Sequence, residues 1–214
     1  MNNLKLLLLF TLISMSAQGQ DIAILKYDGG GDWYANPTAL PNLINFCNKN
    51  IKTKINIKPK TVEVESVDLF NFPIVFMTGH GNVFFNNDAV INLRNYLNSG
   101  GFLHISDNYG LDVYIRREMK KVFPNQDFRE IPYNHPIYHQ SYSFDKGIPK
   151  IHEHDNKPAQ GFGIFIEGRL VCFYDYETDL SDGWEDAVIH NNPNNVREKA
   201  LKMGANIIEF AFKN

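Results

Sequence analysis

The sequence predicts an α/β domain with a mainly parallel sheet, and two observations carry this prediction. Three short runs, residues 22–27, 73–78 and 102–106, predict central strands, and the continuous apolar run at 22–27 is typical of a strand buried on both faces. Between these runs lie segments whose apolar residues recur at helical spacing. Strands that alternate with helices favour a parallel sheet wound by right-handed crossovers. The composition, 43% hydrophobic and 21% charged over 214 residues, fits one packed domain across residues 20–214.

The first half of the chain supplies most of this pattern. The run at 22–27 leads through a glycine-rich loop into a predicted helix at 37–48, and residues 61–64 alternate like an edge strand. The strand at 73–78 is followed by a helix that runs up to Gly100, which can take the left-handed conformation that ends a helix. After the strand at 102–106, residues 111–122 predict another helix, which ends before Pro124.

The second half is less regular. Residues 131–158 are polar and aromatic and predict an ordered loop region over one edge of the sheet. Residues 163–166 and 169–174 flank a Glu-Gly turn and predict a hairpin. The last segment, 196–212, has helical spacing and is expected to pack back on the sheet.

Residues 1–19 are typical of a signal peptide. Lys5 precedes an apolar run at 6–13 that is too short to cross a bilayer, and Ala17 and Gly19 suit cleavage before Gln20. We therefore expect an exported protein, periplasmic or secreted, with no membrane span in the mature chain. Loss of Lys5 moves the formal charge from −3 to −4. With no basic patch, this charge argues against nucleic acid as a partner.

The two cysteines, Cys47 and Cys172, lie in apolar surroundings and lack CxxC spacing. They predict two buried free thiols, with a disulfide as the alternative that export would permit.

Polar residues follow each of the three apolar strands. Asp28 follows the first, His80 the second, and Asp107 and Asn108 the third. In open parallel sheets, ligands bind outside the carboxyl ends of the strands. We therefore predict that three loops converge on one polar crevice built around Asp107.

Asp107 and His80 are the candidate catalytic residues of this crevice, as nucleophile, acid, base or metal ligand. The candidate ligand-binding residues lie at the strand ends or offer an aromatic ring, and they are Asp28, Gly30, Gly31, Asp32, Trp33, Asn108, Tyr109, His135 and Trp184. Structural roles are the alternatives. Asp107 suits a helix N-cap, His80 suits a cap or backbone contact, and the glycines suit a tight turn because Tyr34 breaks the GxGxxG spacing.

The remaining histidines form no HExxH motif. His135 and His139 are four apart, but Pro136 argues against a helix across them. We therefore expect no cofactor. The alternative is a divalent metal held by His80, Asp107 and one further histidine from the set His135, His139, His152 and His154.

Several short motifs together resemble one family. They are the GGGDW core within 27–33, residues 78–81, the run at 99–103, Asp107, residues 135–138, and 179–180 with 183–185. On these the chain resembles domain of unknown function family forty-one fifty-nine, DUF4159, of the class I glutamine amidotransferase-like group. The resemblance implies a flavodoxin-like three-layer sandwich. It also implies that Asp107 stands where a glutaminase of the group carries its cysteine, counted from Gly100 and Gly101.

A carboxylate cannot replace a thiolate nucleophile in glutamine hydrolysis, so we expect no glutamine amidotransferase activity. Two functions then remain. The first is a non-catalytic module of the cell envelope that binds a small polar ligand or an envelope protein, with Trp33, Tyr109 and Trp184 as flat apolar contacts. The alternative is a hydrolase that uses Asp107 and His80, with or without a metal.

Overall fold

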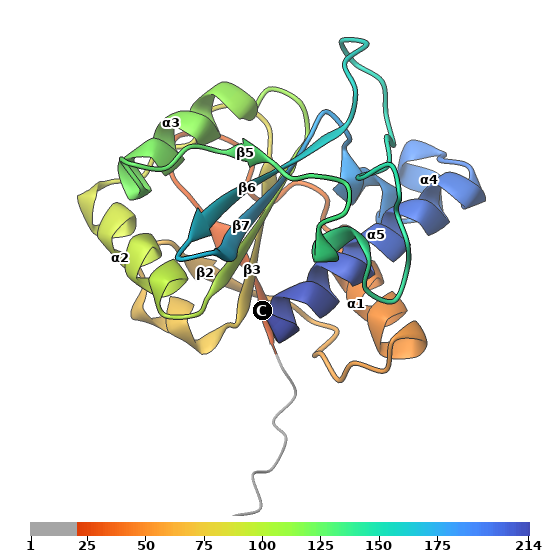
Figure 1. The fold of residues 1–214 in the computed structure, drawn as a ribbon, viewed down its shortest axis with the longest axis horizontal. Coiled ribbons are helices and arrows are strands. Elements are labelled where there is room, and N and C mark those ends of the chain that lie inside the picture. Colours follow the sequence, from red (N-terminus) through yellow and green to blue (C-terminus); the bar gives the residue numbers. More distant parts are fainter. Residues whose placement is uncertain (1–20) are drawn as a thin grey trace, which may run out of the picture.

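The computed structural model describes residues 21–214, so the predicted signal peptide lies outside the described residues. A seven-stranded sheet in the order β2-β1-β3-β4-β7-β6-β5 forms the centre (Figure 1). Its strands are β1 Ile22–Lys26, β2 Lys60–Glu63, β3 Ile74–Gly79, β4 Phe102–Asp107, β5 Arg129–Glu130, β6 Gln160–Ile166 and β7 Arg169–Tyr176.

The sheet has a parallel part and an antiparallel part. Neighbouring strands from β2 through β1, β3 and β4 to β7 are parallel. β6 then pairs antiparallel with β7, and β5 antiparallel with β6. Numbered among themselves, the five parallel strands follow the order 2-1-3-4-5 of flavodoxin-like sheets. The predicted α/β fold, with its mainly parallel sheet and late hairpin, is confirmed.

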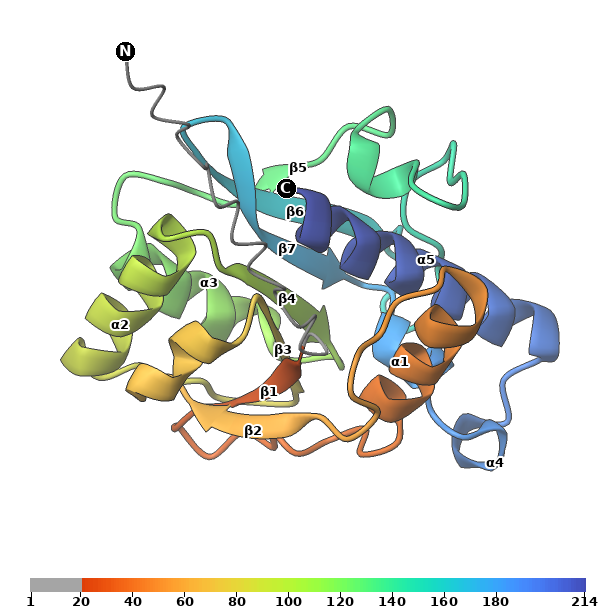
Figure 2. The same ribbon diagram turned by 90° about the horizontal axis from the view of Figure 1, so that it is seen from below.

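Helices cover both faces of the sheet. Figures 1 and 2 show α2 and α3 on one face and α1 and α5 on the other, which makes three layers. The helices are α1 Ala39–Asn50, α2 Asn87–Asn98, α3 Asp112–Val122, the one-turn α4 Ala187–His190 and α5 Asn194–Lys213, and the 3₁₀ turns are η1 Val67–Asn71, η2 Pro136–Tyr138 and η3 Leu180–Gly183. None of the helices in residues 21–214 is long and apolar enough to cross a membrane.

The continuous apolar runs of the sequence arise because the central strands have a core on each face. In β3, Val75 and Met77 pack into the core under α2 and α3, while Ile74 and Phe76 pack into the core under α1 and α5. Every residue of β3 and β4 is buried. Side chains on both faces of such a strand are therefore mostly apolar, because both faces are covered.

Both cysteines are buried and free, as the first of the two alternatives predicts. Cys47 lies in the core under α1 and α5, and Cys172 in the core on the other face of the sheet. Gly100 ends the turn after α2 with φ of 111°, the left-handed conformation predicted for it.

Candidate functional site

The loop after β1 is folded onto the loop after β3. The Asp28 carbonyl accepts a 2.7 Å hydrogen bond from the Phe84 N–H, and the Gly31 N–H donates to the Asn82 carbonyl at 2.9 Å. A Cβ on Gly31 would lie 2.7 Å from that carbonyl oxygen. Gly30 has φ of 87° and open space around its Cα. The glycines thus permit a close backbone approach and a left-handed turn, which is the structural alternative weighed for them.

Asp32 and His80 form a pair at this end of β1 and β3. The Asp32 carboxylate accepts the backbone N–H of His80, and its Oδ2 lies 3.0 Å from the ring Nδ1. Burial acts to raise the pKa of Asp32, but the hydrogen bonds from His80 outweigh it and hold the pKa below its usual value. The His80 side chain is 54% exposed. Trp33 is partly buried against the core.

Asp107 ends β4 and is only 4% exposed. Its Oδ1 accepts the Leu111 N–H at 3.2 Å, and its Oδ2 accepts the Tyr174 hydroxyl at 3.0 Å. Burial raises the pKa of Asp107 to about 6, and nearby carboxylates add to the shift. Gly79 and Asp107 are register partners, so His80 and Asp107 follow neighbouring strands. Their side chains nevertheless bond to different residues.

Trp184 is fully buried, which corrects its predicted role as a ligand contact. Its indole N–H donates to the Ala200 carbonyl at 2.8 Å, and its ring packs 5.7 Å from that of Phe76. A large ring with no exposed surface is a core residue, and it cannot offer a flat face to a ligand.

His135 is also a structural residue and lies away from Asp107. Its Nδ1 accepts the Ile137 N–H at 3.2 Å, which caps η2, and its ring packs against Phe210. Phe210 packs in turn on Phe102, at the opposite end of β4 from Asp107. The structure therefore does not bring His135 into the predicted crevice.

The N-terminus of α1, where a doubly wound sheet often binds an anionic ligand, is occupied by the chain's own carboxylate. Glu185 is 3% exposed, and its Oε1 accepts the N–H groups of Thr38 and Ala39, each at 2.9 Å. These are the donors that a phosphate would use. The glycine loop and α1 therefore do not form a phosphate cradle.

A second group of polar side chains lies at the carboxyl ends of β4 and β7. It joins four separate stretches of chain, and we call it the β4–β7 cluster: Asn36, Asn108, His152, His154, Asp179, Ser181, Asp182 and His190.

Amides and a hydroxyl connect one side of the β4–β7 cluster. Asn36 donates to Ser181 Oγ at 2.9 Å and to Asp182 Oδ1 at 2.7 Å. Asn108 accepts the Ser181 hydroxyl at 3.1 Å and donates to Asn36 Oδ1 at 3.0 Å. Asn36 and Ser181 are 145 positions apart in the sequence. This network fixes one carboxylate oxygen of Asp182 and leaves Oδ2 directed to the histidines.

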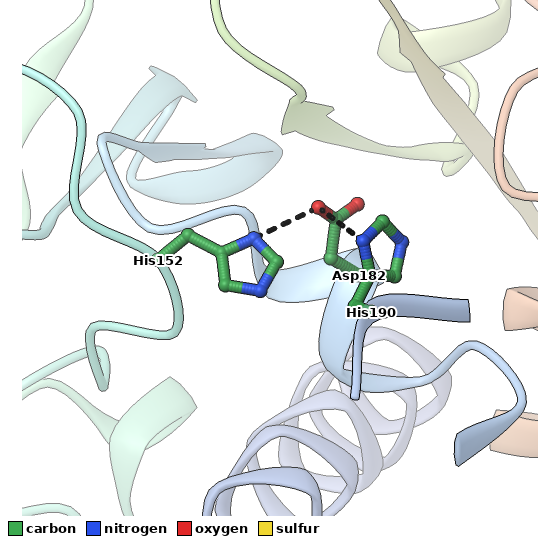
Figure 3. Close-up of side chains that lie close together, drawn as sticks. All are labelled: His152, Asp182 and His190. Carbon is green, nitrogen blue, oxygen red and sulfur yellow. Dashed lines mark ion pairs between the residues drawn. The ribbon is translucent and has the colours of Figure 1, made fainter. Parts of the chain in front are cut away.

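Histidines and aspartates form the other side of the cluster. Figure 3 shows His152 and His190 on either side of Asp182, with their Nδ1 atoms 3.0 Å and 3.7 Å from its Oδ2. His152 Nδ1 also lies 3.4 Å from Asp179 Oδ2, which bonds to His154. Hydrogen bonds to Asp179 and Asp182 raise the pKa of His152 to about 10. Burial acts to raise the pKa of Asp182, but the contacts with His152, His190 and Asn36 together outweigh it and lower that pKa.

The backbone around the β4–β7 cluster is strained. Four residues other than glycine have left-handed conformations here: Asn36 at φ 56°, Tyr109 at 69°, Asp179 at 51° and Asn191 at 52°. Asn and Asp tolerate this conformation better than other residues, so the cost, about 1–3 kcal/mol, falls mainly on Tyr109; such conformations concentrate at functional sites. Tyr109 is 47% exposed and stacks on the His154 ring, with 4.4 Å between centroids.

A buried pair of side chains, His104 and Asp175, lies next to the cluster in the interior of the fold. His104 Nε2 lies 2.6 Å from Asp175 Oδ2, and Ser106 donates to Asp175 Oδ1 at 3.0 Å. Burial lowers the pKa of His104 to about 3 and raises the pKa of Asp175 well above its usual value. Both side chains are therefore uncharged, and one proton lies in the hydrogen bond between His104 Nε2 and Asp175 Oδ2. Ser106 Oγ also lies 3.1 Å from Ser181 Oγ, which connects the pair to the cluster.

Asn36, Ser181, Asp182 and His190 were not predicted as site residues. No local motif marks them, because each reaches the cluster through contacts with distant parts of the chain. One signal was available, since Asp182 lies between the motif pieces at 179–180 and 183–185 on which the family resemblance depends.

The fold and site together define a flavodoxin-like α/β domain with a strained histidine and aspartate cluster at the carboxyl edge of its sheet. The chain belongs to the family described as domain of unknown function DUF4159, whose model matches residues 21–212. A search of curated proteins finds no match.

Proposed function

We propose that the protein is an exported binding domain of the cell envelope that holds a small polar ligand at the β4–β7 cluster. The observation that carries this proposal is the set of four left-handed, non-glycine residues around one group of polar side chains. Backbone strain of this kind persists only where surrounding contacts enforce it, and it is typical of ligand sites. Tyr109 supplies an exposed aromatic face beside the cluster.

Binding fits the side chains better than covalent catalysis. Both oxygens of Asp107 accept hydrogen bonds, from Leu111 and Tyr174, and its carboxylate is buried. His80 pairs with Asp32. The pKa of Asp107, about 6, suits an acid or a base, so a hydrolase with Asp107 and His80 is the alternative proposal. That hydrolase requires substrate to reach a carboxyl group that is 4% exposed.

The thiols support the expected lack of glutaminase activity. Cys47 and Cys172 are both buried in apolar cores. Burial raises the pKa of Cys47 to about 12 and that of Cys172 well above its usual value. A thiol held in its neutral form is a poor nucleophile. We therefore propose that the protein shares the fold of class I glutamine amidotransferase-like proteins but not their reaction.

A thermal-shift panel tests the binding role. Monosaccharides, amino acids and nucleoside phosphates are added separately to the protein in the presence of EDTA, and the melting temperature is measured. A ligand at 100 times its Kd stabilises the folded state by about 2.7 kcal/mol. We expect one of these classes to raise the melting temperature of the wild type and not of Tyr109→Ala.

Tyr34→Ala is the matched control, because Tyr34 is 65% exposed and lies in the loop after β1. It should keep the full ligand-induced shift. The proposal fails if no class stabilises the protein, or if Tyr109→Ala responds like the wild type. Hydrolysis of a compound in the panel that is lost in Asp107→Ala would instead establish the alternative.

A further inference from the structure

Three possible metal-ligand atoms in the β4–β7 cluster come from separate segments of the chain and lie close together. His152 belongs to the loop before β6, Asp182 to η3 and His190 to the end of α4. One ligand atom from each lies within 4.8 Å of the other two. Figure 3 shows the two imidazole rings on opposite sides of the carboxylate. Two histidines and one aspartate are a common donor set for transition metals.

We propose that His152, Asp182 and His190 form a three-ligand site for a divalent transition-metal ion such as Zn²⁺. This inference rests on the proposed binding role of the cluster and names the metal as part of what it holds. Ligand atoms around a tetrahedral Zn²⁺ with bonds of about 2.0–2.1 Å are about 3.4 Å apart. The Nδ1 to Oδ2 separations of 3.0 and 3.7 Å lie on either side of that value.

The position of His190 is the observation that favours a metal over simple hydrogen bonding. Its Nδ1 is 3.7 Å from Asp182 Oδ2, which is too long for a hydrogen bond. Its Nε2 is buried and has no hydrogen-bond partner among the described residues. Partial burial has removed water from the His190 ring, and the ring has gained no hydrogen bond among the described residues in return. Coordination through Nδ1 would give the His190 ring a strong interaction, although Nε2 would stay without a partner within residues 21–214.

The surroundings orient the other two ligands. His152 Nε2 lies 2.9 Å from Asn192 Oδ1, so an Nε2–H can donate there while a metal ion takes the place of the proton through which Nδ1 contacts Asp182. Asn36 donates to Asp182 Oδ1 at 2.7 Å and holds Oδ2 toward the two rings. Outer hydrogen bonds of this kind are typical of metal-bound histidines and carboxylates.

The proposed site has three protein ligands, whereas structural zinc sites usually have four. A fourth position would therefore be open to water or to a small polar ligand. α4 has no buried residue. A metal at His190 would consequently tie this helix to η3 and to the loop at His152.

Isothermal titration of Zn²⁺ into protein that carries no polyhistidine tag tests the site, after EDTA treatment and buffer exchange. We expect one Zn²⁺ per chain. His190→Ala should weaken binding at least about 100-fold, and Asn192→Ala about 10–100-fold, the range for loss of an outer-shell partner. Co²⁺ in place of Zn²⁺ should give the visible absorption of a four-coordinate ion, lost in His190→Ala.

His139→Ala is the matched control, because His139 is a partly exposed histidine outside the cluster and should leave Zn²⁺ affinity unchanged. His190 lies on a helix with no buried residue, so its variant should fold, and circular dichroism checks this. The metal proposal is overturned if the wild type binds no Zn²⁺ or if His190→Ala binds it equally well. The two proposals fail separately. If no compound stabilises the protein in the EDTA panel while the titration still shows Zn²⁺ binding, only small-ligand binding that does not need the metal is overturned.

Discussion

Two polar regions lie at the carboxyl ends of the strands of the same sheet, and they are built differently. The first, Asp28 to Asp32 with His80, follows β1 and β3, and its ion pair is well exposed. The second, the β4–β7 cluster, follows β4 and β7 and rests on the buried pair of His104 and Asp175. The first region is stabilised mainly by backbone contacts between two loops. The second joins residues up to 146 positions apart through side chains.

The difference indicates which polar residues contribute most to the stability of this fold. An exposed ion pair gains little because water solvates both partners and salt screens them. A buried network is costly to break, since each group left without a partner has lost its hydration. Substitutions should therefore have large effects at the second region and small ones at the first.

The largest effect is expected for Asp175→Ala. It leaves His104 and Ser106 buried without their shared partner, and each buried polar group left without a partner typically costs about 1–3 kcal/mol. Urea unfolding followed by circular dichroism measures the loss. Asp127→Ala serves as control, because Asp127 is 79% exposed in its pair with Lys120. Equal stabilities for the two variants would show that the buried pair contributes no more to folding stability than the exposed one.

A smaller effect is expected from Asp107, and it depends on pH. The folded pKa of about 6 lies above the usual 3.8, so the folded chain holds the proton more tightly than the unfolded chain. The resulting stability is complete below pH 3.8 and is lost as the pH rises through 6. A shift of about 2 units corresponds to about 3 kcal/mol.

Asp107→Asn removes this dependence while it keeps an acceptor for the Leu111 N–H and a polar group beside Tyr174. Relative to the wild type, the variant should therefore gain up to about 3 kcal/mol between pH 4 and pH 8. Urea unfolding at both pH values checks this, with exposed Asp28→Asn as control. A difference between variant and wild type that stays constant with pH would contradict the raised pKa.

The two regions also differ in how far the sequence predicts them. Asp28, His80 and Asp107 could be placed at one edge of the sheet because strand ends are visible in the hydrophobic pattern. The same rule places Asn108 and Tyr109 beside the second region. Burial of Trp184 was missed because it depends on α5 and β3 packing around it, which no local pattern encodes.

The late elements show the same limit. β5 has two residues and α4 has four, and neither is long enough for a periodic pattern. His190 lies at the end of α4, directly before the left-handed Asn191, and its Nδ1 faces Asp182, a residue of η3. Elements long enough to show periodicity were thus predicted, while the cluster, formed by turns and tertiary contacts, was not.

The smallest effect is expected for the pair in the first region. His80→Ala should cost less than about 1 kcal/mol, because the His80 side chain is 54% exposed and the backbone N–H of residue 80 still donates to Asp32. Asp32→Ala should cost more, since it removes the acceptor for both that N–H and the ring. Urea unfolding of each variant, compared with the wild type, measures the two costs. If His80→Ala proved as costly as Asp175→Ala, the exposed pair would be as important to the fold as the buried one, and the contrast between the two regions would fail.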